Sequence, residues 1–269
     1  MTLDEKITSR ENRRLKDARK VRDGRSDELI FVEGLRLAEE ALRSGVEVDE
    51  CFVTSSFTET ERGKDVKAKI RQLGRPIFEL SENLFESIAD TKNSQGIILI
   101  CHRPTAKNLE LASEKLPIIV CLDQVNNPSN LGAVCRTAEG AGASGLVVTL
   151  GSADIYSSKS LRAAMGSAFR LRVQQGERFT SVVSWAKEQN LTVTAAAASG
   201  AIAYTEVDWK RPRLLLFGSE GHGLSEEQLD VVEEIVRIPM QENVESLNLA
   251  VACGIVLFEA RRQNHLPTR

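Results

Sequence analysis

Three segments in the second half of the chain place Gly, Asn, Pro and Ser directly after predicted strands. They read "LDQVNNPSNLGAVCRTAEGAGA", "LLLFGSEGHGLS" and "IPMQENVESLNLAVACG". In an open α/β sheet, ligands collect at the carboxyl ends of the strands, and glycines there let a ligand approach the backbone. The three segments therefore predict loops that line one ligand crevice.

Each loop also has a purely structural interpretation. The stretch "GSEGHG" lacks the G-x-G-x-x-G spacing of a dinucleotide fingerprint, and no GK[ST] of a P-loop follows it. A tight strand-to-helix turn is therefore favoured over a phosphate cradle for this loop alone. Ser246 and Asn248 open a mostly apolar helix and could cap it, face a ligand, or do both. Glu220 is either a solvated loop acid or a functional one.

Alternating strands and helices must position these loops. "IIVCLDQ" and "SGLVVTL" are continuous apolar runs, typical of parallel strands buried on both faces. Further strands are predicted in "LTVTAAAA", "RLLLFGS" and "VRIPM", and helices near 130–141, 157–167, 179–189, 225–234 and 246–263. A strand followed by a helix, repeated, predicts an α/β fold with a doubly wound, mostly parallel sheet.

The first half predicts a smaller α/β unit. Thr8 and Glu11 fit a capping box for a short basic helix with a thin apolar stripe at Leu15, Ala18 and Val21. Strands are predicted in "ELIFVEG", "VDECFVT", "RPIFEL" and "GIILICH", and helices in "LRLAEEALRSG", 59–73 and 81–89. The proline-containing stretch after residue 103 breaks this rhythm. We therefore expect an N-terminal domain at 1–103, a linker at 104–116 and a second domain at 117–269.

The composition excludes several classes of protein. The content of 42% hydrophobic and 27% charged residues is ordinary for a soluble globular protein. No apolar run reaches the roughly 18 residues of a spanning helix, and the N-terminus lacks the apolar core of a signal peptide. We therefore expect a cytoplasmic protein. The 5 Cys and 3 His are scattered, which argues against a disulfide framework and a zinc site and predicts buried thiols without a metal.

The net charge of -3 hides an asymmetry. Residues 6–25 contain nine Lys or Arg against three acids, a charge of +6, so the remaining residues sum to -9. Such a run is either a solvated surface or a site for a polyanion, since a local field survives an acidic body. If a polyanion binds there, the cations that would contact it include Arg10, Arg13, Arg14, Lys16, Arg19 and Lys20.

Taken together and in order, the three loop segments resemble the signature motifs of the SpoU family, also called TrmH, of SPOUT-superfamily RNA ribose 2'-O-methyltransferases. The resemblance covers residues 117–263, and "YSSKSLRAAMGSAFRL" is a further stretch similar to the family. In the first half, "ITSRENRRLKDARKV", "FVEGLRLAEEAL" and "SQGIILI" resemble the family's N-terminal substrate-binding domain, a small α/β fold related to RNA-binding ribosomal proteins.

The resemblance implies an S-adenosylmethionine-dependent enzyme whose mostly parallel sheet ends in a deep trefoil knot. The general rule that chains do not thread loops argues against a knot, so the knot rests on the resemblance alone. Matching motif positions implies that the adenosyl group lies at Gly218, Ile238 and Leu247, with Glu220 nearby. Contacts there would be largely with the backbone.

The resemblance also implies the catalytic residues. Its key arginine corresponds to Arg136, Asn130 would position that arginine, and Ser246 and Asn248 would complete a polar wall with Glu220. A ribose hydroxyl is a poor nucleophile until its proton leaves, so oxygen must be activated and aligned with the methyl group. Arginine is a poor resting base because its guanidinium does not give up its proton in proteins. Arg136 would therefore stabilise the alkoxide as a fixed cation, or act with an RNA phosphate that takes the proton; we favour the first.

Partner and substrate follow from the same resemblance. Lys159 and Arg162 are candidate RNA contacts closer to the active site, and SPOUT enzymes are typically homodimers. Family members with an N-terminal domain commonly act on large-subunit ribosomal RNA, which favours 23S-type ribosomal RNA as substrate. The alternatives are a tRNA 2'-O-methyltransferase and a noncatalytic RNA-binding protein that keeps the knotted scaffold. A small-molecule methyltransferase of Rossmann topology would need a glycine-rich loop where "LDQVNNPSN" stands.

Overall fold

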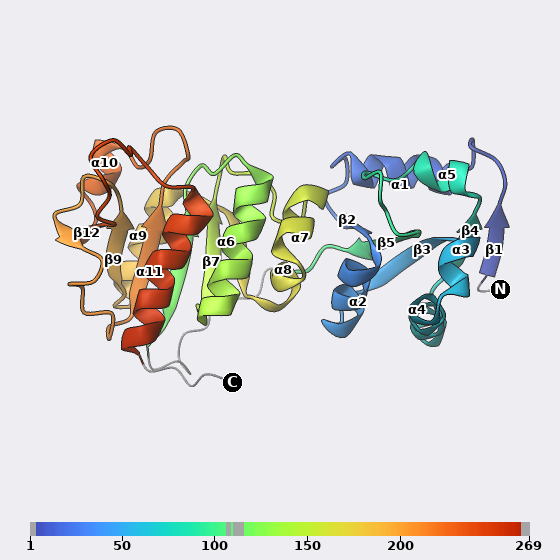
Figure 1. Ribbon diagram of the computed structural model, residues 1–269, viewed down its shortest axis with the longest axis horizontal. Coiled ribbons are helices and arrows are strands. Elements are labelled where there is room, and N and C mark those ends of the chain that lie inside the picture. Colours follow the sequence, from blue (N-terminus) through green and yellow to red (C-terminus); the bar gives the residue numbers. More distant parts are fainter. Residues whose placement is uncertain (1–3, 106–108, 110–115, 265–269) are drawn as a thin grey trace. The chain divides into compact units, whose positions relative to one another are not determined.

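The computed structural model describes residues 4–105, 109 and 116–264, which form two compact units (Figure 1). The first unit contains Met1–Thr105 and Tyr156–Arg170, and the second contains Ala106–Ile155 and Leu171–Arg269. Most of the expected linker at 104–116 lies outside the described residues. The sequence pattern did not indicate that Tyr156–Arg170, which lies between stretches of the second unit, packs with the first.

The first unit is built on a mixed five-stranded sheet. Its strands, in spatial order, are β1 (Asp4–Ile7), β4 (Ile77–Leu80), β3 (Val48–Thr54), β5 (Ile97–His102) and β2 (Leu29–Glu33). The first three are parallel, and the β3–β5 and β5–β2 pairs are antiparallel. Strand β1 was not predicted, because "DEKI" is mostly polar and buries only Ile7. It is an edge strand, where polar residues remain in contact with solvent.

Helices cover this sheet. They are α1 (Arg13–Arg22), α2 (Leu35–Arg43), α3 (Ser55–Glu59), α4 (Glu61–Gln72), α5 (Glu82–Glu86), α7 (Ser158–Ala164) and α8 (Ser167–Arg170). Helix α1 buries Leu15, Ala18 and Val21, as the apolar stripe predicts. The predicted capping box at Thr8 is wrong: Asn12 is the N-cap, and its side chain accepts a hydrogen bond from Arg14 N at 2.9 Å. Asparagine caps at least as well as threonine, so the helix begins after Asn12.

The second unit has a seven-stranded sheet that is parallel throughout. Its strands, in spatial order, are β10 (Ile202–Ala203), β12 (Glu234–Arg237), β9 (Thr192–Ala196), β11 (Arg213–Phe217), β6 (Ile118–Leu122), β7 (Gly145–Thr149) and β8 (Val173–Glu177). Every residue of β6, β7 and β11 is buried. The prediction of a parallel sheet buried on both faces is therefore confirmed for this unit.

Helices lie on both faces of this sheet. Helix α9 (Phe179–Glu188) buries Val182, Val183 and Ala186 against alternate residues of the central strands. Helices α6 (Pro128–Ala141) and α11 (Leu249–Gln263) lie side by side on the other face (Figure 1). The helix predicted over 225–234 is a single turn, α10 (Glu226–Leu229), because the chain must enter β12 at Glu234.

The last helix returns to the middle of the sheet. Strand β12 is separated from β6 by β9 and β11, yet the helix that follows β12 packs against α6, which follows β6. Residues 238–248 must therefore cross the carboxyl ends of the intervening strands. This crossing brings the third loop segment over the first two. The spacing of the segments in the sequence does not predict this arrangement.

The described residues also bear on the other expectations from composition. All five cysteines are free and buried, as predicted, and burial raises the pKa of the thiols of Cys51, Cys101, Cys121 and Cys253. In the described part of the chain, no group of His, Cys, Asp and Glu side chains is arranged to hold a metal ion. None of the described helices combines the length and apolar character needed to cross a membrane.

Candidate active site

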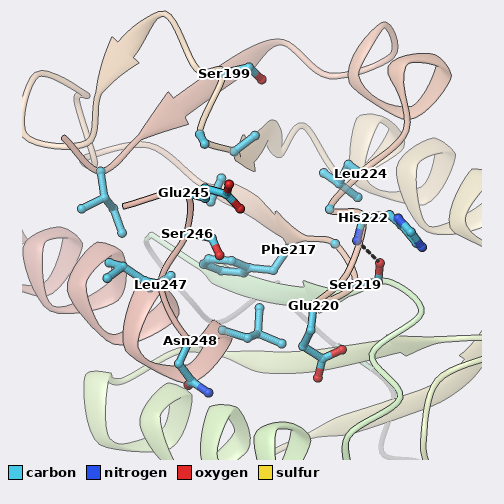
Figure 2. Close-up of a pocket in the computed structure, with 18 of the residues that line it drawn as sticks. Ser199, Phe217, Ser219, Glu220, His222, Leu224, Glu245, Ser246, Leu247 and Asn248 are labelled. Carbon is cyan, nitrogen blue, oxygen red and sulfur yellow. Dashed lines mark hydrogen bonds between the residues drawn. The ribbon is translucent and has the colours of Figure 1, made fainter. Parts of the chain in front are cut away.

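A cavity of about 690 Å³ lies at the carboxyl ends of the strands of the second unit (Figure 2). Its walls come from residues 196–199 after β9, residues 217–224 after β11, the crossing segment near 238–249, and Asn130 near the start of α6. This volume is in the range of small-molecule sites, which is about 300–1,000 Å³. The predicted convergence of the three loop segments on one crevice is therefore observed.

The loop after β11 is a tight turn. Ser219 and Gly223 exchange backbone hydrogen bonds of 3.2 and 2.9 Å, and Gly223 has a φ of 66°. A Cβ on Gly218 would lie 2.1 Å from the carbonyl carbon of Gly223, so no other residue fits that position without moving the turn. The structural interpretation is therefore confirmed for Gly218 and Gly223, and the turn also forms one wall of the cavity.

A buried carboxylate holds the end of this loop in place. Ser225 and Gln228 form a capping box at α10, and the Gln228 Nε2 donates to Asp123 Oδ2 at 2.9 Å. Thr149 Oγ1 donates to Asp123 Oδ1 at 2.7 Å, and Asp123 is only 4% exposed. The sequence analysis did not single out Asp123. An acid at the end of an apolar strand was nevertheless a usable signal, because burying a carboxylate is costly unless hydrogen-bond donors surround it.

The polar start of α11 has one cap. Asn248 is the N-cap, and its Oδ1 accepts from Ala250 N at 2.9 Å and from Val251 N at 3.4 Å. The expectation that Ser246 caps this helix is wrong, because the helix begins at Leu249 and Ser246 lies too far before it to reach the free amides. Ser246 instead lines the cavity.

A chain of hydrogen bonds joins residues from all three segments. Asn248 Nδ2 donates to Asn130 Oδ1 at 3.1 Å, and Asn130 Nδ2 donates to Glu220 Oε1 at 3.1 Å. Because the other end of the Asn248 amide caps α11, the positions of all three side chains are coupled to that helix terminus. We call this chain the polar relay. It places amide and carboxylate groups at the wall of the cavity, where they can orient a hydroxyl group.

The other predicted residues of the site are placed as follows. Gly218, Ile238 and Leu247 line the cavity, whereas Arg136 does not. Arg136 is exposed on α6, six residues after Asn130, and helical geometry turns it about 120° away from that residue. No hydrogen bond or ion pair holds its guanidinium within the part of the chain that the structure describes.

The predicted RNA contacts of α1 are mostly exposed and paired with acids. Arg13 pairs with Asp17 at 3.6 Å, and Lys16 pairs with Glu11 at 2.6 Å. The Lys16 ammonium holds the pKa of the Glu11 carboxyl below its ordinary value. Arg10 is exposed before the helix. Such exposed pairs are weak, so they leave these cations free to exchange an acid for a phosphate.

Arg19 and Arg162 differ from the other predicted contacts, because folded structure holds both. Arg19 donates to the carbonyl and the hydroxyl of Ser87.

Arg162, on α7, lies 2.7 Å from an oxygen of Asp90 and 3.8 Å from one of Glu33. The Glu33 side chain is 1% exposed and also accepts from the amides of Asp90 and Thr91. Lys159, one turn earlier on α7, is exposed.

Comparison with known proteins gives matches along the whole chain. The sequence model of the SpoU rRNA Methylase family matches residues 117–258, and that of the MRM3-like substrate binding domain matches residues 10–99. The 23S rRNA (guanosine(2553)-2'-O)-methyltransferase RlmP of Bacillus subtilis is 31% identical over 258 residues, which is 95% of this chain and 98% of that protein.

Two solved structures are informative about the extent of the likeness. The crystal structure of an AdoMet-bound rRNA methyltransferase from Sinorhizobium meliloti has a TM-score of 0.87 and 30% identity, and the match covers 99% of this chain and 100% of that one. A structure concerned with 2-OH methylation of C/U34 on tRNA is 32% identical with a TM-score of 0.52, covering 98% of that chain but only 56% of this one.

Proposed function

The chain belongs to the SpoU rRNA Methylase family, and from that premise we propose that it transfers a methyl group from S-adenosylmethionine to a ribose 2'-hydroxyl of ribosomal RNA. The observation that carries this proposal is that the family match, residues 117–258, includes all three segments that line the cavity. Large-subunit RNA is the substrate named for the Bacillus subtilis relative, which is matched over nearly its whole length.

The cavity fits the methyl donor. Its lining includes the apolar residues Phe217, Val236 and Leu249, against which an adenine ring would pack, and the backbone of the turn at Gly218 forms one of its walls. We assign Gly218, Ile238 and Leu247 to adenosine binding, mostly through main-chain contacts. When bound there, S-adenosylmethionine supplies an electrophilic methyl group on a sulfonium.

The residues of the chain must then align and activate the ribose oxygen. We assign orientation of the hydroxyl to the polar relay and to Ser246, because these groups lie together at the cavity wall with their amides fixed by hydrogen bonds. The developing alkoxide needs a fixed positive charge, which lowers the barrier most in a site that is partly dry. We assign this role to Arg136 from its place in the family motif. Its guanidinium is exposed and lies outside this cavity, so the role requires that bound RNA or a second copy of the chain fix it beside the reacting oxygen.

An exposed apolar face of the second unit supports a homodimer. Val251 and Phe258 are each 51% exposed, and their spacing of seven residues puts them on one face of α11. A second copy that covered this face would also approach Arg136 on the adjacent helix α6. We therefore propose that two subunits associate through α6 and α11, near their cavities. Sedimentation of an active, stable monomer would contradict this.

The remaining assignments rest on family membership. We propose that the second unit contains a deep trefoil knot formed by the crossing segment 238–248 and that the protein works in the cytoplasm on its RNA substrate. We further propose residues 1–103 as the substrate-binding domain, 104–116 as the linker and 117–269 as the catalytic domain. Arg10, Arg13, Lys16, Arg19, Lys159 and Arg162 remain the proposed RNA contacts.

A tRNA substrate is the second candidate. It is supported by the solved structure concerned with C/U34 methylation on tRNA, but that match covers only 56% of this chain. The rRNA methyltransferase from Sinorhizobium meliloti, by contrast, has a counterpart for 99% of it. The presence of a counterpart for the first unit favours ribosomal RNA.

Transfer of labelled methyl from S-adenosylmethionine to unmodified ribosomal RNA and tRNA tests the proposal directly. We expect label in a 2'-O-methylnucleoside of large-subunit RNA, which nucleoside analysis and mapping would identify. Label in tRNA would keep the chemistry and overturn the substrate. If neither RNA is labelled, a partly assembled ribosomal particle is the next substrate to test. Failure to bind S-adenosylmethionine at all would favour a noncatalytic RNA-binding protein.

A further inference from the structure

The cavity of the second unit carries acidic groups and lacks a compensating cation. Glu220 and Glu245 both line it, and none of the described residues that line it is Lys or Arg. His222 belongs to the same wall, but its ring points away from the cavity in Figure 2. With two carboxylates and no Lys or Arg among the described residues that line it, the wall carries an excess of negative charge.

The two carboxylates differ in their partners. Glu220 accepts a hydrogen bond from Asn130 and is part of the polar relay. Glu245 has no hydrogen bond or ion pair with any residue in the described part of the chain. In Figure 2 its carboxylate is turned toward the middle of the cavity, beside Ser246. Its charge is therefore neither used by the fold nor neutralised by a neighbour.

The methyl donor and its by-product differ by one charge. S-Adenosylmethionine carries a sulfonium, an ammonium and a carboxylate, a net charge of +1 at neutral pH. Loss of the methyl group converts the sulfonium to an uncharged thioether, so S-adenosylhomocysteine has a net charge of zero. A carboxylate in the cavity wall therefore attracts S-adenosylmethionine more strongly than S-adenosylhomocysteine, even though the two ligands share nearly all their van der Waals contacts.

We propose that Glu245 is a specificity-determining residue that makes the cavity prefer the cationic methyl donor to the neutral thioether left after transfer. This inference rests on the proposed function. Because Glu245 is exposed, water screens its field, and the expected effect is a preference of about two- to five-fold from this one residue. The preference lowers product inhibition, since the by-product loses an attraction at the moment the methyl group leaves.

Equilibrium binding of three ligands to the full chain at pH 8 and low salt tests the proposal. The ligands are S-adenosylmethionine, S-adenosylhomocysteine and sinefungin, which carries an ammonium where the sulfonium stands. We expect Glu245→Gln to weaken binding of both cationic ligands two- to five-fold and to change the Kd of S-adenosylhomocysteine by less than 1.5-fold. Glu242→Gln is the matched control, because Glu242 is an exposed acid of the same segment that does not line the cavity.

The outcomes separate charge from other roles. Equal weakening of all three ligands by Glu245→Gln would assign the residue to shape or folding and overturn the proposal, as would an unchanged ratio. A second measurement uses wild-type protein and so does not depend on a variant that folds. The Kd of S-adenosylhomocysteine divided by the Kd of S-adenosylmethionine must fall as salt is raised from about 0.05 to 0.5 M, because salt screens the attraction of Glu245 for the sulfonium. Wild-type protein that binds none of the ligands would instead overturn the proposed function.

Discussion

Helix α1 of the first unit and the cavity of the second differ in the sign and the placement of their charges. On α1, cations such as Arg13 and Lys16 lie on an exposed surface and pair with acids only loosely. In the cavity wall, Asn130, Glu220 and Asn248 are joined by hydrogen bonds of defined geometry, and no described Lys or Arg lines the space. The first region is suited to a long polyanion that can bind in many registers. The second is suited to one small ligand and one reacting oxygen.

The difference predicts that the two regions can be disabled separately. Variants of the polar relay or Arg136 should lose methyl transfer and keep RNA affinity, whereas variants of α1 should lose RNA affinity and keep cofactor affinity. Each variant below is therefore measured for methyl transfer, for RNA binding and for binding of S-adenosylmethionine.

The largest effect is expected for Arg136→Ala. Removing a preorganised charge that stabilises a developing oxyanion typically costs about 10²–10³ in turnover. We expect at least that loss in single-turnover methyl transfer, with the Kd for S-adenosylmethionine changed by no more than a few fold. Because the residue is exposed and unpaired among the described residues, thermal stability should not change. Retained turnover would remove Arg136 from the mechanism.

Asn248 allows the two roles of one side chain to be separated. Asn248→Asp keeps the acceptor that caps α11 but removes the amide that donates to Asn130, whereas Asn248→Ala removes both. We expect both variants to lose methyl transfer about 10- to 100-fold, because each breaks the polar relay. Only the alanine variant should lose stability, by about 1 kcal/mol for the missing cap.

Thermal denaturation of the two Asn248 variants, read beside their methyl transfer rates, provides the measurement. If Asn248→Asp transferred methyl groups at the wild-type rate, the hydrogen bond to Asn130 would have no part in catalysis, and the residue would be a helix cap only.

Smaller effects are expected for the cations of α1. The double variant Arg13→Gln, Lys16→Gln should raise the Kd for ribosomal RNA about three- to ten-fold. The slope of log Kd against log salt concentration should decrease by about one to two, because about one unit is lost for each phosphate contact removed. Arg62→Gln is the control, since Arg62 is an exposed, acid-paired cation of the same unit outside α1. An equal effect of the control would mean that net charge alone, and not the placement of α1, determines affinity.

Arg162 differs from the exposed cations of α1, because the folded structure holds its guanidinium. Its half-buried guanidinium lies against Asp90 and near the buried Glu33 within the first unit. Arg162→Gln should therefore lower the free energy of unfolding by about 1–2 kcal/mol, because a buried carboxylate loses its cation. Denaturant titration provides the measurement. If RNA affinity fell without a loss of stability, Arg162 would act only as the RNA contact proposed above and not as a structural partner of Glu33.

Local sequence patterns predicted much of the fold, because they report which faces of an element are buried. The stripe at Leu15, Ala18 and Val21 and the continuous apolar runs of β6, β7 and β11 matched the buried faces. Patterns failed where an element is short or polar, as in strand β1 and the single turn of α10. They also failed where two good capping residues compete, as Ser246 and Asn248 do.

The sequence by itself determined the family, the parallel sheet of the second unit and the loop segments that line its cavity, because motif residues and apolar periods are properties of short stretches. Only the tertiary structure decided that Asn248, Asn130 and Glu220 form one relay, that Asp123 supports the loop after β11 through Gln228, and that Tyr156–Arg170 packs with the first unit. These relations join residues up to 118 positions apart. Such contacts arise from the order of strands in the sheet and from the return of α11 to α6, and neither is encoded in the spacing of any single motif.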